Sequence, residues 1–207
     1  RGSYLPGDDV PSSAKDFWAY VDHVCDDPDL GAASFLEYHH RRHFYLGAAD
    51  GAKSDYLFWR QCELLNKNST GKASTVYDAI GAAQVAKASF AGMRFLNHVR
   101  DKVKIWPFDA IPTNGTVVVE IYTSIAARAA GVAKGRSKVR DGHALDNALH
   151  ALGSQPHKPF ERYTDHATDA LITAAWLRNV AGNPQFWAPN ALNSKIATTE
   201  GWTFGVI

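Results

Sequence analysis

The sequence predicts an α/β fold in which a mixed sheet is flanked by helices and helix predominates. One observation is the run 116–122, which is apolar apart from Glu120 and suits a strand covered on both faces. A second is the small side chains of the Ala-rich stretches 125–133 and 165–180, which allow a helix to lie close against a sheet. A third is the composition: of 207 residues, 45% are hydrophobic and 21% charged, which is typical of folded globular chains and not of disorder.

The remaining elements follow from periodicity and from turn residues. Apolar side chains at helical spacing predict a short helix that begins near Asp16 and ends before Pro28. Pro107 favours extended backbone at the residue before it. We therefore expect further helices at 16–25, 56–65, 79–103 (divided near residue 92) and 143–152, an irregular stretch at 35–44, an extended piece at 105–108 and a last short strand at 202–207.

Composition also excludes several classes of protein. No uninterrupted apolar run reaches about 18 residues, so the sequence predicts no membrane-spanning helix. Cys25 and Cys62 are too few for a disulfide framework and form no Cys-x-x-Cys pair for zinc. This cysteine usage favours a reducing, cytoplasmic setting.

The length favours one domain spanning residues 1–207. Residue 1 is Arg and the following 4–9 stretch reads as a loop, so we expect the chain to enter the fold after its first strands. One strong strand cannot form a sheet alone, because an isolated strand pair is only marginally stable. The missing strands would then come from upstream residues or from a second chain.

Glu120 is the first candidate for chemistry. Strand alternation places it on one face with Val118 and Tyr122, inside an otherwise apolar run. A carboxylate buried there costs several kcal/mol unless a cation or hydrogen bonds compensate it. The compensating cation is either a divalent metal ion or Arg or Lys; the alternative is that Glu120 lies at the exposed end of the strand.

Asp165 and Asp169 are four residues apart, which places both carboxylates on one face of the helix predicted at 165–180. Their repulsion, about a few tenths of a kcal/mol on a wet surface, would be removed by a hard cation between them. Clusters of carboxylates are the ligands that Mg²⁺ and Mn²⁺ prefer. Asp165 has an alternative role as a helix cap or a partner of the helix dipole. Asp169 lies too far into the helix to be its cap.

The middle of the chain is basic. Residues 64–140 hold 12 Lys and Arg against 4 Asp and Glu, although the whole chain has a net charge of only +1. Lys134, Arg136, Lys138 and Arg140 alternate along a Gly-containing stretch, a pattern that can follow a phosphate backbone and release counterions. The alternative is a solvated basic loop with no partner.

His39, His40 and His43 are close in sequence, as metal ligands on a helix would be. No His-Glu-x-x-His motif accompanies them, and the neighbouring Arg41 and Arg42 would repel a cation. We therefore expect these histidines to have a surface role.

Six short pieces of the sequence, taken together in their order along the chain, resemble the domain-of-unknown-function family 429. Members of this family are described as predicted nucleases of the RNase H fold. The resemblance extends from about Arg41 to the C-terminus. It is carried by Tyr77–Val85, Phe90–Leu96, Ile105–Phe108, Val118–Tyr122, Asp165–Leu171 and Glu200–Gly205.

The resemblance implies a mixed sheet flanked by helices, with acidic residues on the first strand, the fourth strand and the last helix that together hold a divalent metal ion. Glu120 matches the fourth strand, and Asp169, with Asp165 beside it, matches the helix. The first-strand Asp has no counterpart, because Asp8 and Asp9 lie in a Pro/Gly loop. The chain would then be the C-terminal, larger part of an RNase H-like domain, with residues 1–70 as a helical insertion, and would be inactive by itself.

These observations predict a nuclease that depends on Mg²⁺ or Mn²⁺ and hydrolyses phosphodiester bonds. In this interpretation Glu120, Asp165 and Asp169 bind metal and are catalytic, and the basic stretch 134–140 binds nucleic acid. One alternative is a non-catalytic domain that binds nucleic acid or protein, because a fold does not determine a function. Another is a phosphotransferase that acts on a small molecule.

Overall fold

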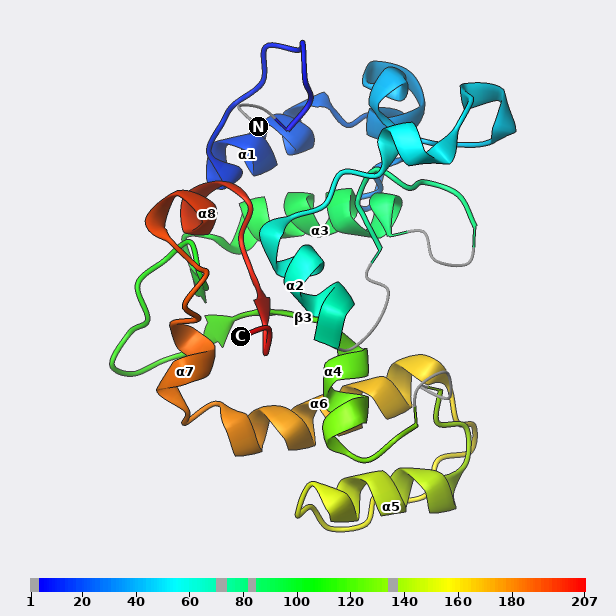
Figure 1. Ribbon diagram of the computed structural model, residues 1–207, viewed down its shortest axis with the longest axis vertical. Helices are drawn as coiled ribbons and strands as arrows, with labels where there is room; N and C mark the ends of the chain where they lie inside the picture. Colours follow the sequence, from blue (N-terminus) through cyan, green and yellow to red (C-terminus); the bar gives the residue numbers. More distant parts are fainter. Residues whose placement is uncertain (1–3, 70–73, 82–84, 134–137) are drawn as a thin grey trace. The chain divides into compact units, whose positions relative to one another are not determined.

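The computed structural model describes residues 4–69, 74–81, 85–133 and 138–207 (Figure 1). The chain forms two compact units, and each unit consists of segments that are not consecutive in the sequence. Unit 1 consists of Arg1–Leu65, Lys72–Val119 and Leu192–Trp202, and unit 2 of Asn66–Gly71, Glu120–Ala191 and Thr203–Ile207. The single domain 1–207 and the insertion at 1–70 stay predictions.

Unit 1 is built around two helices that pack on each other, α1 (Ala14–Val24) and α3 (Ala86–Val99). Ser13 caps α1 by accepting a hydrogen bond from the backbone N–H of Asp16. Between these helices the chain forms short irregular turns, as expected for 35–44. They are the π-helical turn η1 (Phe35–His39) and the 3₁₀ turns η2 (Arg41–His43), η3 (Ala48–Asp50) and η4 (Lys53–Tyr56). The helix α2 (Gln61–Ser69) follows them, and its last residues belong to unit 2. Unit 1 also contains the helix α8 (Ser194–Thr199).

Aromatic rings form the core of unit 1. Phe35 is fully buried, stacks on Phe90 with ring centroids 4.8 Å apart, and meets Phe17 edge to face at 6.3 Å. Phe44 packs edge to face on Phe90 at 5.3 Å. Rings from α1, η1 and α3 therefore share one core, which connects residues before position 70 to the helix that follows it.

Two predicted helices have different bounds in the structure. The stretch 79–103 does not divide near Gly92, because α3 runs through this residue without a break and buries Phe90 and Arg94 on either side of it. A glycine inside a helix costs about 1 kcal/mol relative to Ala, which packing against α1 outweighs. The helix expected at 56–65 is also displaced, since the chain forms η4 first and begins α2 at Gln61.

The strands are short and parallel. β1 (Lys104–Ile105) pairs with β2 (Val117–Val118) within unit 1. In unit 2, β3 (Glu120–Ile121) pairs with β4 (Thr203–Phe204), in the register Glu120 to Thr203. The expected strand 116–122 is thus interrupted at Val119, and its expected burial on both faces is wrong at β3, where both residues are exposed. The physical reason is that β2 and β3 each have two residues and pair with a single strand, so no wide sheet covers the apolar run 116–122.

Unit 2 is helical around the β3–β4 pair. Its helices are α4 (Thr123–Ala129), α5 (Gly142–Ala151), α6 (Asp165–Val180) and α7 (Pro184–Trp187). Asp141 caps α5 and Thr164 caps α6 with side-chain oxygens that accept backbone N–H bonds. Helices α4 and α6 lie side by side (Figure 1). The ring of Trp176 on α6 meets Phe204 of β4 at 6.0 Å, which joins the helices to the strand pair.

The described part of the chain is therefore rich in helix and contains two small parallel strand pairs. In that part, no helix has both the length and the apolar character needed to cross a membrane.

Candidate functional site

Glu120, Asp165 and Asp169 all belong to unit 2. Glu120 is exposed on β3, and its Oε1 accepts a hydrogen bond from Thr203 Oγ1 of β4 at 2.8 Å. The expectation of a buried Glu120 is therefore wrong, and the alternative of an exposed strand end is correct. The physical reason is the short strand pair, which leaves the faces of β3 open.

Asp165 and Asp169 lie in the first two turns of α6. The Nζ of Lys138 is 3.3 Å from Asp165 Oδ2 and 3.5 Å from Asp169 Oδ2, so one ammonium group contacts both carboxylates. The cation predicted between the two carboxylates is a divalent metal ion, which stays a prediction, and in the structure the ammonium group of Lys138 lies between them. Thr164, and not Asp165, provides the side-chain cap of this helix.

Asp169 also faces the end of the strand that carries Glu120. Thr123 Oγ1 donates a hydrogen bond to Asp169 Oδ2 at 3.3 Å. Thr123 is the first residue of α4 and follows Glu120 by three positions. The contact between α4 and α6 therefore brings Asp169 near the chain segment that leaves β3.

Two hydroxyl groups of this site were not expected from the sequence. Thr123 directly follows the run 116–122, and a hydroxyl at a strand end is a signal that could have identified it. Thr203 carries no comparable signal, because its contact with Glu120 depends on a strand pairing between residues 83 positions apart. Long-range pairings of two-residue strands leave little trace in the sequence.

The three carboxylates do not form a ready ligand set for one ion. Within the described residues, Glu120, Asp165 and Asp169 are not a group whose ligand atoms all lie within 4.8 Å of one another. Coordination of one ion by all three therefore requires their side chains to move closer together.

The basic residues expected at a phosphate backbone contact the same carboxylates. Arg140 Nε lies 3.2 Å from Asp165 Oδ1, and Lys138 contacts its other oxygen. The hydrogen bond from Arg140 and the charge of Lys138 outweigh partial burial and hold the pKa of Asp165 below its usual value. Lys134 and Arg136 lie outside the described residues.

A pocket of about 450 Å³ opens beside Asp165. The phenol of Tyr163 is held by the Nε2 atom of His157 at 2.8 Å. The lining therefore combines two guanidinium groups, a phenol and the imidazole of His166 with the Asp165 carboxylate, and guanidinium groups favour anions such as phosphate. The residues that line it are Arg140, Arg162, Tyr163, Thr164, Asp165 and His166.

Comparison of the sequence with protein-family models and curated proteins, and of the structure with solved structures, finds no match. The resemblance to the domain-of-unknown-function family 429 stays a prediction.

Proposed function

We propose that this protein is a hydrolase of phosphodiester bonds, with a site at the start of α6 that uses a divalent ion such as Mg²⁺ or Mn²⁺. The acidic and basic groups of unit 2 support a metal-dependent phosphodiester hydrolase as the class of protein. Within this class, we propose an RNase H-like arrangement of the site. The observation that carries the proposal is the pairing of Asp165 and Asp169 around one cation, Lys138, next to a pocket lined by Arg140 and Arg162.

The donor chemistry supports a hard divalent ion. Asp165, Asp169 and Glu120 offer only carboxylate oxygens, and Thr123 adds a hydroxyl. The cationic contact of Lys138 indicates that the space between the two aspartates favours positive charge. A bound ion would supply activation of water and stabilisation of the leaving oxygen.

Each side chain then has a definite role. Asp165 and Asp169 would hold the ion, with Glu120 approaching from β3. Lys138 would leave the carboxylates and, with Arg140, hold the phosphate backbone. Because both cations are paired with carboxylates in the structure, binding of nucleic acid and of metal at this site would be coupled.

The test is hydrolysis of labelled DNA and RNA oligonucleotides with Mg²⁺ or Mn²⁺, comparing the wild type with Asp169→Asn and Glu120→Gln. We expect a rate loss of at least the roughly 10–100-fold that accompanies loss of outer-shell groups at metal sites. Glu161→Gln is the matched control, because Glu161 is an exposed carboxylate near the same helix and should leave the rate unchanged. Equal rates for Asp169→Asn and wild type would exclude the proposed site.

Nucleic-acid binding is tested separately. Neutralising Lys134, Arg136, Lys138 and Arg140 together should weaken duplex DNA binding and flatten its salt dependence, by about 0.9 in the log–log slope for each lost phosphate contact. An unchanged slope would identify the stretch as a solvated loop. Binding with no hydrolysis under any metal would favour the non-catalytic domain, and transfer of phosphate from a nucleotide to a small molecule would favour the phosphotransferase.

A further inference from the structure

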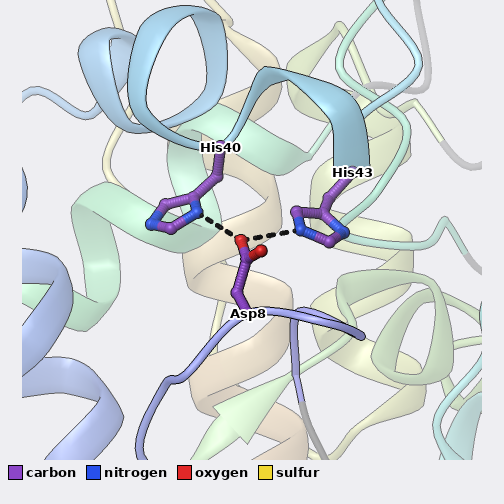
Figure 2. Close-up of side chains that lie close together, drawn as sticks. All are labelled: Asp8, His40 and His43. Carbon is purple, nitrogen blue, oxygen red and sulfur yellow. Dashed lines mark hydrogen bonds and ion pairs between the residues drawn. The ribbon is translucent and has the colours of Figure 1, made fainter.

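A second group of possible metal ligands lies in unit 1, away from the carboxylates of α6 in sequence (Figure 2). The Nδ1 atom of His40 and the Nε2 atom of His43 both lie 2.9 Å from the same oxygen, Oδ2 of Asp8. The two histidine side chains are each 9% exposed and that of Asp8 is 20% exposed. The expected surface role is wrong for these two histidines, whereas His39 is exposed.

Buried neighbours position the backbone on both sides of this cluster. Leu5 and Phe44 are fully buried and fix the chain near Asp8 and His43, respectively. The π-helical turn η1 ends at His39 and η2 begins at Arg41, so His40 lies between the two turns and His43 ends the second. Both side chains project towards Asp8 (Figure 2). π-Helical turns are rare and are found frequently at functional sites. The cluster is therefore built from core packing and is not a chance meeting of mobile side chains.

A further partner holds the ring of His40. The hydroxyl of Tyr20 lies 2.9 Å from His40 Nε2 and can orient the ring whichever nitrogen carries the proton.

A cation already contacts the cluster. The guanidinium of Arg42 pairs with Asp8 Oδ1, and its Nε lies 3.3 Å from His43 Nε2. The side chain of Arg42 is 63% exposed, so it can turn away into solvent at little cost. Arg42 shows that the cluster attracts positive charge, and it is also the group that would compete with an ion.

We propose that Asp8, His40 and His43 bind a divalent transition-metal ion of the Zn²⁺ class. Two imidazoles and one carboxylate are a known ligand set for such ions, with further positions left for water or another ligand. Around a tetrahedral ion with bonds of about 2.0–2.1 Å, ligand atoms lie about 3.3 Å apart. The present separations of 2.9 Å between the nitrogens and Asp8 Oδ2 need to open by only a few tenths of an ångström. The ion would join the loop of Asp8 to the turn η2.

The experiment is titration of the metal-free full chain with Zn²⁺ by isothermal calorimetry, and with Co²⁺ by visible absorption, which reports the coordination geometry. We expect one saturable site. Asp8→Asn and His43→Ala should each weaken Zn²⁺ binding at least tenfold, by the scale known for groups that support metal ligands. His39→Ala is the matched control, because His39 is an exposed neighbour bonded to Asp26 and should leave the affinity unchanged.

Arg42→Gln provides the test that does not depend on removing a ligand. It leaves all three ligands in place and takes away the competing cation, so Zn²⁺ should bind several-fold more tightly than to the wild type. The absence of a saturable site in both the wild type and Arg42→Gln would overturn the proposal. An affinity that falls in His39→Ala but not in His43→Ala would do so as well, and this result would leave the proposed hydrolase site of unit 2 untouched.

Discussion

Removal of the charge of Arg94 should strongly destabilise unit 1. Arg94 lies on α3, its side chain is 11% exposed, and its Nε donates a hydrogen bond to Asp22 Oδ1 of α1 at 2.9 Å. Its NH1 group donates to the carbonyl oxygens of Asp27, at 3.0 Å, and Gly31. One guanidinium therefore joins α3 to α1 and to the loop that follows α1.

The perturbation is Arg94→Met, which keeps the apolar stem and removes the charge. Asp22, whose side chain is 16% exposed, then keeps the Asn97 amide at 3.0 Å and the His98 imidazole at 3.2 Å as polar partners, but it loses its guanidinium partner. Removing one partner of a buried ion pair costs about 3–5 kcal/mol. For a chain of this length, 1 kcal/mol corresponds to roughly 2–4 °C, so we expect Tm to fall by roughly 6–20 °C.

The assay is urea unfolding followed by circular dichroism, together with thermal melting. Arg162→Met is the control, because Arg162 is exposed and its loss should change the unfolding free energy by no more than about 0.5 kcal/mol. Asp22→Leu combined with Arg94→Met should cost less than the sum of the two single changes, since neither charge is then left unpaired. A loss below 1 kcal/mol for Arg94→Met, or strict additivity in the double variant, would refute the reasoning.

Three further changes test other parts of the structure. Phe35→Ala removes a fully buried ring and should cost about 3–5 kcal/mol in urea unfolding, whereas Phe35→Leu should cost clearly less. Gly205→Ala places a Cβ 2.6 Å from the Trp176 ring at a φ of +97°, so a lower Tm and altered tryptophan fluorescence are expected; an unchanged spectrum would contradict this contact. Burial opposes ionisation of Asp22, but hydrogen bonds from Arg94 and Asn97 outweigh it and lower its pKa, so its stabilisation is complete above the unfolded pKa of about 3.9 and is lost as pH falls through the folded value. The difference in unfolding free energy between wild type and Asp22→Asn should therefore narrow from pH 7 to pH 3, and a constant difference would count against the assignment.

Local signals in the sequence predicted several helices closely. The helix expected at 165–180 has the same bounds as α6, because Thr164 offers a side-chain cap directly before it. The helix expected near Asp16 corresponds to α1, and that expected at 143–152 corresponds to α5 within one residue. Caps and periodicity act between residues a few positions apart, so the chain encodes them without reference to the rest of the fold.

The pairing of Asp165 with Asp169 is also encoded locally, since helical spacing alone places both carboxylates on one face. The identity of the cation between them is not encoded locally. Lys138 reaches this position through the segment between α4 and α5, and no spacing rule relates it to α6. The sequence predicted Lys138 as a phosphate contact, whereas the structure shows it bonded to the carboxylates.

What the sequence by itself determined is therefore the helices α1, α5 and α6, the predominance of helix and the acidic pair on α6. Tertiary structure alone decided that the strand at 116–122 is interrupted, that Glu120 is exposed, and that His40 and His43 turn inward onto Asp8. Asp8 and His40 are 32 positions apart, and their contact depends on how the rings of Phe35 and Phe44 pack beneath the connecting turns. Such contacts form only when a long loop closes, and the free energy that closes it comes from the shared core and not from the residues that meet.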